Sequence, residues 1–295
     1  MTTQAIRFVA WGELLWDLFP DAARLGGAAA NAAYHAACLG AHSLLVSRVG
    51  NDELGTRALK LLGERGVETH AIQIDDGAPT GTVSVTIENG EPRYRIASGV
   101  AWDRIGWRDE LAAEFAQASV VCFGTLAQRS PLGFDAVEQA LAHCPASTLR
   151  ICDLNVREPF ATPQVIDRAL SLSRVVKLNE SELSTLARLF GQRDALRWLL
   201  EERGIELVAV TRGARGASLS SRQAHFEHAG FPLSSTSGDA VGAGDAFSAC
   251  LSLELARGSS PELALQNANR YAAHVASEPG AMPPAPSWLD RRPLD

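Results

Sequence analysis

The sequence predicts an α/β fold with a central, mostly parallel sheet covered by helices on both faces. Short apolar runs, each the length of a buried strand, recur at residues 7–11, 43–49, 119–123, 149–154, 174–178 and 207–211. Between several of these runs lie apolar residues at helical spacing, for example Leu183, Leu186 and Leu189. Fully apolar strands that alternate with helices are typical of parallel sheets buried on both faces.

The segment at residues 82–96 departs from this parallel pattern. Residues 82–88 alternate polar and apolar side chains, Asn89-Gly90 favours a tight turn, and residues 93–96 return as a second strand. A hairpin with one wet face is expected to lie off the main sheet, where it could serve as a lid. An edge hairpin without a functional role is the alternative.

The composition excludes several classes of protein. The chain has 295 residues, 46% hydrophobic and 21% charged, which is too apolar for a disordered protein and too charged for a membrane-embedded one. The formal net charge of −7 argues against a nucleic-acid or acidic-membrane binder, because such binding needs clustered positive charge. Lys60 and Lys177 are the only lysines and neither follows a glycine, so a G-x-x-x-x-G-K-[ST] phosphate loop is excluded.

The cysteines and the amino-terminal segment indicate a cytoplasmic protein. Five widely spaced cysteines lie mostly in apolar runs, which fits reduced thiols in a core. Arg7, Glu13 and Asp17 interrupt the apolar stretch at residues 6–19, so we expect a strand there rather than a signal peptide.

Polar residues follow the ends of three predicted strands. In open α/β sheets, ligands bind beyond the carboxyl ends of the strands. We therefore expect a site at that edge of the sheet. The residues concerned are Asp153, Asn155 and Arg157 after the first of these strands, Lys177 and Asn179 on the second, and Thr211, Gly213 and Gly216 on the third.

The strongest motif is Gly-Asp-Ala-Val-Gly-Ala-Gly-Asp-Ala-Phe at residues 238–247. Gly242 and Gly244 come just before Asp245 and an apolar helical pattern, so backbone N–H groups at a helix N-terminus are expected to form an anion site. Asp245 could instead cap the helix or complement its dipole. The glycines favour the anion site, because a simple cap does not need so open a backbone.

A second glycine-rich motif covers residues 26–33, and Gly40 and Gly50 follow it. Gly26 and Gly27 allow a close backbone approach, and Asn31 places an amide on an otherwise alanine-rich helix. Helix capping by Asn31 is the alternative interpretation.

Taken together, these motifs resemble those of the ribokinase-like, or PfkB, family of carbohydrate kinases. The resemblance spans nearly the whole chain, through residues 26–50, 153–157, 179–182, 211–216 and 239–245 in that order. It implies one kinase domain over residues 1–295, folded as a ribokinase-like three-layer sandwich with a small β lid at approximately residues 12–30 and 80–104. The implied ligands are a sugar, ATP and Mg²⁺, with K⁺ as a further candidate, and a homodimer formed through the lid is compatible with it.

The resemblance also implies roles for individual residues. Asp245 matches the catalytic base, and the backbone of Gly242, Ala243 and Gly244 matches the anion hole. Asn179 and Glu182 match the N-x-x-E motif that organises hydrated Mg²⁺, although the same spacing forms a helix capping box. The residues implied in ATP binding are Lys177, Asn179, Thr211, Gly213, Gly216 and Gly244.

Asp239 matches a ligand of a monovalent cation in many members of the family. Two departures weaken this match, because Ala240 replaces the usual threonine or serine and Pro284 stands where a serine often contributes. Backbone carbonyls could still bind the ion.

The sugar is expected on the lid side. Asp17 is a charge inside an apolar segment, which is costly unless it accepts hydrogen bonds, and a solvated loop aspartate is the alternative. The residues implied in substrate binding are Asp17, Gly27, Asn31, Trp102, Gln128, Asn155 and Arg157, although Trp102 could belong to the core of the lid.

Three segments make bacterial fructokinases the best match within the family, namely residues 12–17, 123–131 and 153–157. The nearest rivals are 2-keto-3-deoxygluconate kinases, which bind a carboxylate that Arg129 or Arg157 could hold. Another sugar kinase or a nucleoside kinase of the family is a further alternative, and a non-catalytic sugar sensor is a hypothesis from a different class.

Overall fold

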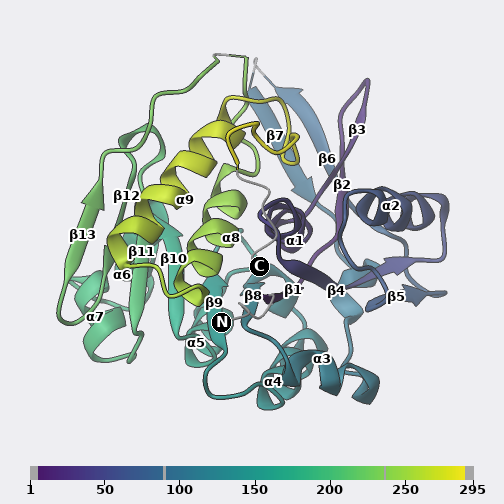
Figure 1. Cartoon of the computed structure of the whole chain (residues 1–295). Coiled ribbons are helices and arrows are strands. Elements are labelled where there is room, and N and C mark those ends of the chain that lie inside the picture. Colours follow the sequence, from purple (N-terminus) through teal and green to yellow (C-terminus); the bar gives the residue numbers. More distant parts are fainter. Residues whose placement is uncertain (1–5, 89–90, 236, 290–295) are drawn as a thin grey trace.

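A computed structural model describes residues 6–88, 91–235 and 237–289 and contains two β-sheets (Figure 1). The larger sheet has nine strands, in the order β13 (His225–His228), β12 (Ala217–Ser220), β11 (Leu207–Thr211), β10 (Val175–Asn179), β9 (Leu149–Asp153), β8 (Val120–Gly124), β1 (Arg7–Trp11), β4 (His42–Gly50) and β5 (Ile72–Asp75). Strands β11 through β5 pair in parallel, and β12 and β13 pair antiparallel. The predicted mostly parallel sheet is confirmed.

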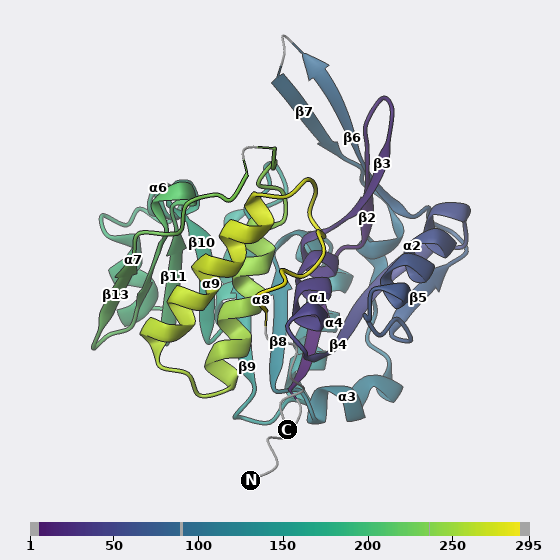
Figure 2. The same ribbon diagram turned by 45° about the horizontal axis from the view of Figure 1, so that its top comes forward.

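The smaller sheet stands away from the body of the molecule (Figure 2). Its order is β3 (Ala23–Gly26), β2 (Leu15–Leu18), β6 (Gly81–Glu88) and β7 (Glu91–Ile96). The predicted hairpin is therefore present as β6 and β7, off the main sheet, while its expected Asn89-Gly90 turn lies outside the described residues. The stretch at residues 6–19 forms two strands, β1 and β2, and not the one we expected, because the chain leaves the main sheet after Trp11 to enter the smaller one.

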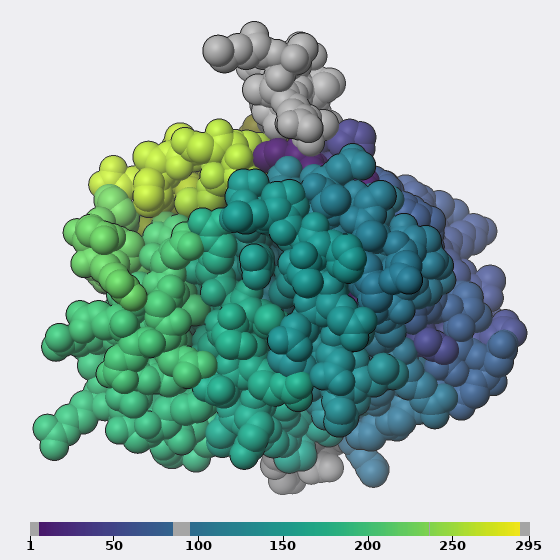
Figure 3. Space-filling view, turned by 90° about the horizontal axis from the view of Figure 1, so that it is seen from below, coloured from purple at the N-terminus to yellow at the C-terminus, as the bar shows by residue number. Residues whose placement is uncertain are grey.

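Helices cover both faces of the main sheet. Apolar residues of α1 (Ala28–Cys38), α2 (Glu53–Glu64), α8 (Ala243–Ala256) and α9 (Pro261–Ala276) pack in the clusters of one face. Those of α3 (Ala112–Ala116), α4 (Pro131–Ala142), α5 (Pro163–Ser171), α6 (Glu180–Leu189) and α7 (Ala195–Glu201) pack on the other. Figure 3 views the molecule from below, where the surface colours run from green through teal to blue. Among the described helices, none is long and apolar enough to cross a membrane.

Three of these helices begin with the same local signal. Ser130, Thr162 and Ser260 are the N-caps of α4, α5 and α9, and each accepts a hydrogen bond from a backbone N–H of the first turn. A proline follows each cap, where its missing N–H is not needed by the helix. The sequence thus fixes where these helices start.

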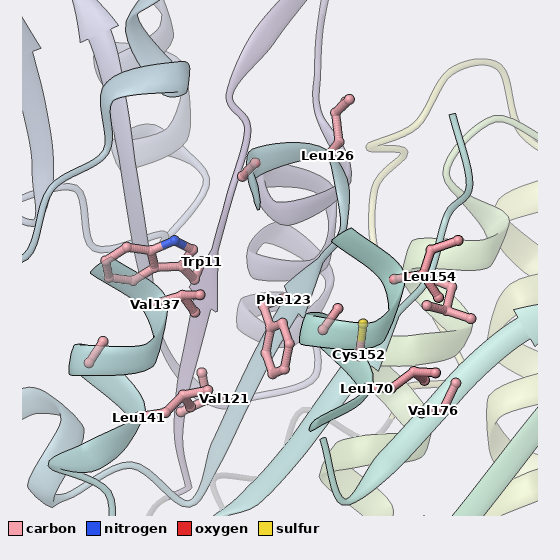
Figure 4. Packing of buried hydrophobic residues seen from close by; sticks show 14 of the residues in the cluster. Trp11, Val121, Phe123, Leu126, Val137, Leu141, Cys152, Leu154, Leu170 and Val176 are labelled. Atoms are coloured by element: carbon pink, nitrogen blue, oxygen red, sulfur yellow. The ribbon is translucent and has the colours of Figure 1, made fainter. Parts of the chain in front are cut away.

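The alternation of β1 explains why its sequence is apolar after Arg7. Phe8 and Ala10 pack against α1 in one cluster, whereas Val9 and Trp11 face the opposite layer. Figure 4 shows that opposite layer, in which Trp11 lies near Val137 of α4. Successive side chains of a strand point to opposite faces, so a sheet covered on both faces leaves β1 no polar side.

Candidate active site at the carboxyl ends of the central strands

A pocket opens where β8, β9 and the start of α8 come together. Pairing between neighbouring strands places Gly124 beside Asp153 and Asp153 beside Lys177, so the polar strand ends converge as expected. Asn155 follows in a left-handed conformation with φ of 40°. The residues that line the pocket are Glu13, Ala28, Ala29, Ala32, Cys122, Phe123, Gly124, Thr125, Leu126, Asp153, Asn155 and Asp245.

The start of α8 has the open backbone that the glycine motif predicts. Gly242 is the N-cap, with φ of 78°, and a Cβ there would lie 2.6 Å from the carbonyl oxygen of Ala281. Only glycine fits such a conformation so close to another backbone. The N-cap of α8 has no side-chain hydrogen bond, so the interpretation of Asp245 as a helix cap is wrong and its carboxylate faces the pocket.

Asn31 reaches Asp245 from α1. Its Nδ2 donates a 2.7 Å hydrogen bond to Asp245 Oδ2, and its Oδ1 is buried without a hydrogen-bond partner in the described part of the chain. The N-cap of α1 is Gly27, so the capping interpretation of Asn31 is also wrong. Burial and the negative charge of Asp153 raise the pKa of Asp245 to about 7, against the opposing effects of Asn31 and Lys177. A carboxylate with such a pKa suits proton transfer near neutral pH.

A buried ion pair lies beneath the start of α8. Lys177 Nζ donates to both carboxylate oxygens of Asp153, at 3.1 and 3.0 Å, and Ser248 Oγ donates to Asp153 Oδ2 at 2.8 Å. A Cβ on Gly244 would lie 2.9 Å from Lys177 Nζ, so the ammonium group sits directly against the backbone of the anion motif. Burial by itself lowers the pKa of Lys177, but the charges of Asp153, Glu182 and Asp245 raise it above its usual value, so the side chain is charged.

Glu13 lines the pocket, and Asp17 lies outside that lining on β2 of the smaller sheet. Asp17 lies half-buried on β2, so the interpretation as a solvated loop residue is wrong, and burial raises the pKa of its carboxyl against the charges of Arg157 and Arg24. Glu13 is 4% exposed and accepts a 3.0 Å hydrogen bond from Ala28 N at the start of α1. Burial likewise raises the pKa of Glu13.

Of the residues expected at the sugar, Asn155 lines the pocket, and the other six do not: Asp17, Gly27, Asn31, Trp102, Gln128 and Arg157. Trp102 is fully buried in the core, and the Arg129 guanidinium stacks on its ring at 4.0 Å. Gln128 is 3% exposed and donates through Nε2 to the carbonyl of Gly124, so it supports the pocket wall. Trp102 thus belongs to the core beside the main sheet, and neither to the sugar site nor to the core of the lid.

A family model for pfkB carbohydrate kinases matches residues 16–288, most of the chain. The chain belongs to the pfkB family of carbohydrate kinases. A fructokinase of Salmonella typhimurium is 28% identical to this kinase over 297 residues, covering 95% of this chain and 96% of that one.

Solved structures agree with this assignment. The fructokinase of Xylella fastidiosa with bound ATP has a TM-score of 0.83 at 25% identity, covering 93% of each chain. The fructokinase of Vibrio cholerae O395 with fructose, ADP and calcium has a TM-score of 0.79 at 25% identity, covering 95% of this chain and 96% of that one. The predicted ribokinase-like fold and the prediction of a carbohydrate kinase are confirmed.

Asn179 and Glu182 of the kinase form the capping box that was their alternative interpretation. Asn179 Oδ1 accepts from Glu182 N at 2.9 Å, and Glu182 Oε2 accepts from Asn179 N at 2.7 Å. Glu182 Oε1 accepts from Val156 N at 2.8 Å. Each carboxylate oxygen keeps a second lone pair. Glu182 can therefore accept hydrogen bonds from the waters of a hydrated Mg²⁺.

The expected nucleotide residues lie at the neighbouring strand end. Thr211, at the end of β11, pairs with Asn179 of β10 and is half-buried. Gly213 begins a short 3₁₀ helix (Gly213–Arg215), and Gly216 ends it with φ of 78°. A Cβ on Gly216 would lie 1.9 Å from the carbonyl oxygen of His228, so this glycine is required by packing whatever its role toward ATP.

The oxygens around Asp239, where a monovalent cation was expected, already accept hydrogen bonds. Its carboxylate accepts hydrogen bonds from Val241 N and Gly280 N, each at 3.2 Å, and pairs with Arg24 of β3 at 3.2 Å. The nearby backbone carbonyls are also engaged. Those of Ala281, Pro283 and Pro284 contact His35 Nε2, Tyr34 OH and His274 Nε2, respectively. Hydrogen-bond donors thus already take up a lone pair of each of these oxygens, and no step is derived through K⁺.

Sequence reasoning missed three residues of this site: Glu13, Asp153 as the partner of Lys177, and Ser248. Glu13 carries a charge inside an apolar segment, so the argument applied to Asp17 would have found it too. Ser248 had no such signal, because a serine one turn after Asp245 is ordinary in a helix. Its contact with Asp153 spans 95 residues and arises only from packing.

Proposed function

We propose that this kinase transfers the γ-phosphate of ATP to a hydroxyl group of fructose, with Asp245 as the base. The observation that carries the proposal is the position of Asp245, in the first turn of α8 after Gly242, facing the pocket and hydrogen-bonded to Asn31. Phosphoryl transfer asks little covalent chemistry of a protein and depends on positioning and electrostatic stabilisation. A carboxylate beside an exposed helix N-terminus supplies both a proton acceptor and fixed dipoles.

In this proposal the chain performs three tasks. Asp245 accepts the proton of the attacking hydroxyl, which a pKa of about 7 permits at neutral pH. The backbone N–H groups of Gly242, Ala243 and Gly244 bind the oxygens on which negative charge develops. Glu182 orients the waters of Mg²⁺, and the ion, when bound, neutralises charge on the phosphates.

The polar groups around the pocket support a polyol as the acceptor. Asn31 Oδ1 is a buried acceptor without a partner among the described residues, which is costly unless a ligand hydroxyl donates to it. Asp17 on the lid strand β2 and Asn155 at the pocket wall could bind further hydroxyls. Relatives named fructokinase, including one solved with fructose, favour fructose among the polyols.

A sugar acid is the second candidate for the substrate. Its carboxylate would need an arginine that is not already paired, and Arg129 and Arg157 differ in this respect. Arg129 donates to Asp103 through Nε at 2.6 Å and Nη2 at 2.8 Å, and its Nη2 also donates to the carbonyl of Ala97 at 2.7 Å. It is therefore already paired. Arg157 is exposed and its charge reaches Glu13 and Asp17, so it is the arginine that could hold a substrate carboxylate.

The test is a comparison of kcat/KM for fructose, 2-keto-3-deoxygluconate, ribose and adenosine, by coupled detection of ADP. We expect fructose to have the highest value. A clear preference for the acid, reduced selectively by Arg157→Ala, would replace fructose with the sugar acid and leave the kinase assignment standing. A sugar that raises the melting temperature but yields no ADP would favour the sensor hypothesis.

A further inference from the structure

We propose that Asp153 is a positioning residue for phosphoryl transfer, which holds Lys177 against Gly244 of the anion hole and presents a fixed negative charge to Asp245. This inference rests on the proposed function, because it takes Asp245 as the base. It gives a role to a buried ion pair that the mechanism above does not use.

The geometry makes this pair a rigid unit. Asp153 and Lys177 face each other across the β9–β10 pairing and are 5% and 7% exposed. Lys177 Nζ donates to both oxygens of Asp153, and the single hydroxyl proton of Ser248 is shared between Asp153 Oδ2 at 2.8 Å and the carbonyl oxygen of Gly244 at 3.1 Å. The pair is thus tied to the first turn of α8, the same turn that carries Asp245.

Its orientation is the feature that suggests a role. The ammonium group lies against Gly244, where the proposed anion hole receives charge, and the carboxylate lines the pocket that Asp245 also lines. A buried ion pair is weak support for stability by itself, because desolvation offsets the attraction. Here its positive end faces the place where negative charge develops, and its negative end faces the proton acceptor.

Other groups also act on Asp245. Glu13 from the β1–β2 connection raises the pKa of Asp245 with its charge, while Lys177 and the Asn31 amide lower it. Cys122 of β8 also faces this cluster, and burial keeps the pKa of its thiol well above the usual value, so it adds no charge. Among the neighbouring charges, Asp153 has the largest effect on the pKa of Asp245.

The experiment measures the acid limb of kcat/KM against pH, with fructose as the substrate, or 2-keto-3-deoxygluconate if the comparison above favours the acid. In Asp153→Asn we expect the midpoint of this limb to fall by roughly one pH unit, because a neighbouring negative charge is lost and Lys177 is left unpaired. Lys177→Met should move the midpoint upward and weaken ATP binding in calorimetry.

A matched control separates this role from simple loss of a buried ion pair. Asp103 pairs with Arg129 in a similarly buried position, with side-chain exposures of 13% and 7%, and it is not among the charges that act on Asp245. Asp103→Asn should lower the melting temperature and leave the midpoint in place. If Asp153→Asn behaves like Asp103→Asn, Asp153 is merely structural and the inference is wrong.

A second variant covers the case in which Asp153→Asn does not fold. Asp153→Asn combined with Lys177→Met leaves no unpaired buried charge. Its midpoint should still lie below that of the wild type, since the effect of Asp153 exceeds that of Lys177, and an unchanged midpoint would also overturn the inference. Failure of the proposed function is recognised separately, by near-normal turnover of Asp245→Asn.

Discussion

Asn31 and Asp245 are joined by a 2.7 Å hydrogen bond although 214 residues separate them in the sequence. The bond links α1, which follows the lid strand β3 directly, to α8, which begins with the proposed anion hole. A primary amide cannot accept the proton of a carboxyl group through Nδ2, so Asn31 orients the base and stabilises its charged form.

The wild-type enzyme should lose activity below neutral pH. Because the pKa of Asp245 is raised to about 7, the base is protonated as pH falls through that value. We expect kcat/KM to decline about tenfold per pH unit on the acid side. Asn31→Ala removes a hydrogen bond that lowers this pKa, so its acid limb should move to higher pH. A limb centred near pH 4 in the wild type would contradict the assignment of Asp245.

Asp245→Asn should lower turnover by roughly 10²- to 10⁴-fold while ATP binding persists. It should also stabilise the fold at pH 8. The pKa is higher in the folded state than its usual value of 3.8, so the carboxyl group favours folding below about pH 4 and this contribution is lost as pH rises through 7. The neutral amide lacks this pH dependence. We expect a melting temperature at least about 2 °C above wild type at pH 8, with the difference shrinking toward pH 4.

Glu182→Gln should change both stability and the Mg²⁺ requirement. Glutamine can keep the bond from Asn179 N, but its amide nitrogen cannot accept from Val156 N, so we expect a loss of about 1 kcal/mol, seen as a lower melting temperature. The proposed role toward hydrated Mg²⁺ adds an increase in the concentration needed for half-maximal rate. Asp194→Ala is the matched control, because Asp194 caps α7 by accepting from Arg197 N at 2.9 Å. Equal Mg²⁺ dependence in the two variants would leave Glu182 as a cap alone.

Asp17→Ala should lower kcat/KM for fructose roughly 5- to 150-fold, because a bound hydroxyl would lose its partner at about 1 to 3 kcal/mol. The affinity for ATP should hardly change. Asp21 is an exposed aspartate between β2 and β3, so Asp21→Ala controls for a change of lid charge. Equal kinetics in the two variants would remove Asp17 from the sugar site.

The sequence predicts the sheet well because strand signals are local. The apolar runs at residues 7–11 and 207–211 coincide with β1 and β11, and the other four runs differ from their strands by one residue at one or both ends. No such run marks β5, β12 or β13. The end of β9 shows where this local signal stops. Asp153 is recognisable as a polar strand end, but its bonds to Lys177 and Ser248 depend on strand order and helix packing.

Arg129 and Trp102 illustrate the same limit. From the sequence, Arg129 is one of two candidates to hold a substrate carboxylate, and Trp102 is a candidate sugar contact or part of the core of the lid. In the fold they stack on each other, and Asp103 neutralises the guanidinium. Residue type alone cannot tell whether such a pair faces a ligand or itself, because that depends on contacts between segments 26 residues apart in sequence.

The contacts around residues 281–284 have a consequence for biosynthesis. His35, Tyr34 and His274 engage carbonyls of this loop, and Ala281 closes against Gly242 at the start of α8. The wall behind the proposed anion hole is therefore made from a segment that a ribosome adds after nearly all of the strands and helices. A nascent chain that ends after α8 would contain Asp153 and Asp245. It would lack residues 281–284, which contact the start of α8 at Gly242. The proposed phosphoryl transfer should therefore require residues 281–284 as well as the motif at residues 238–247.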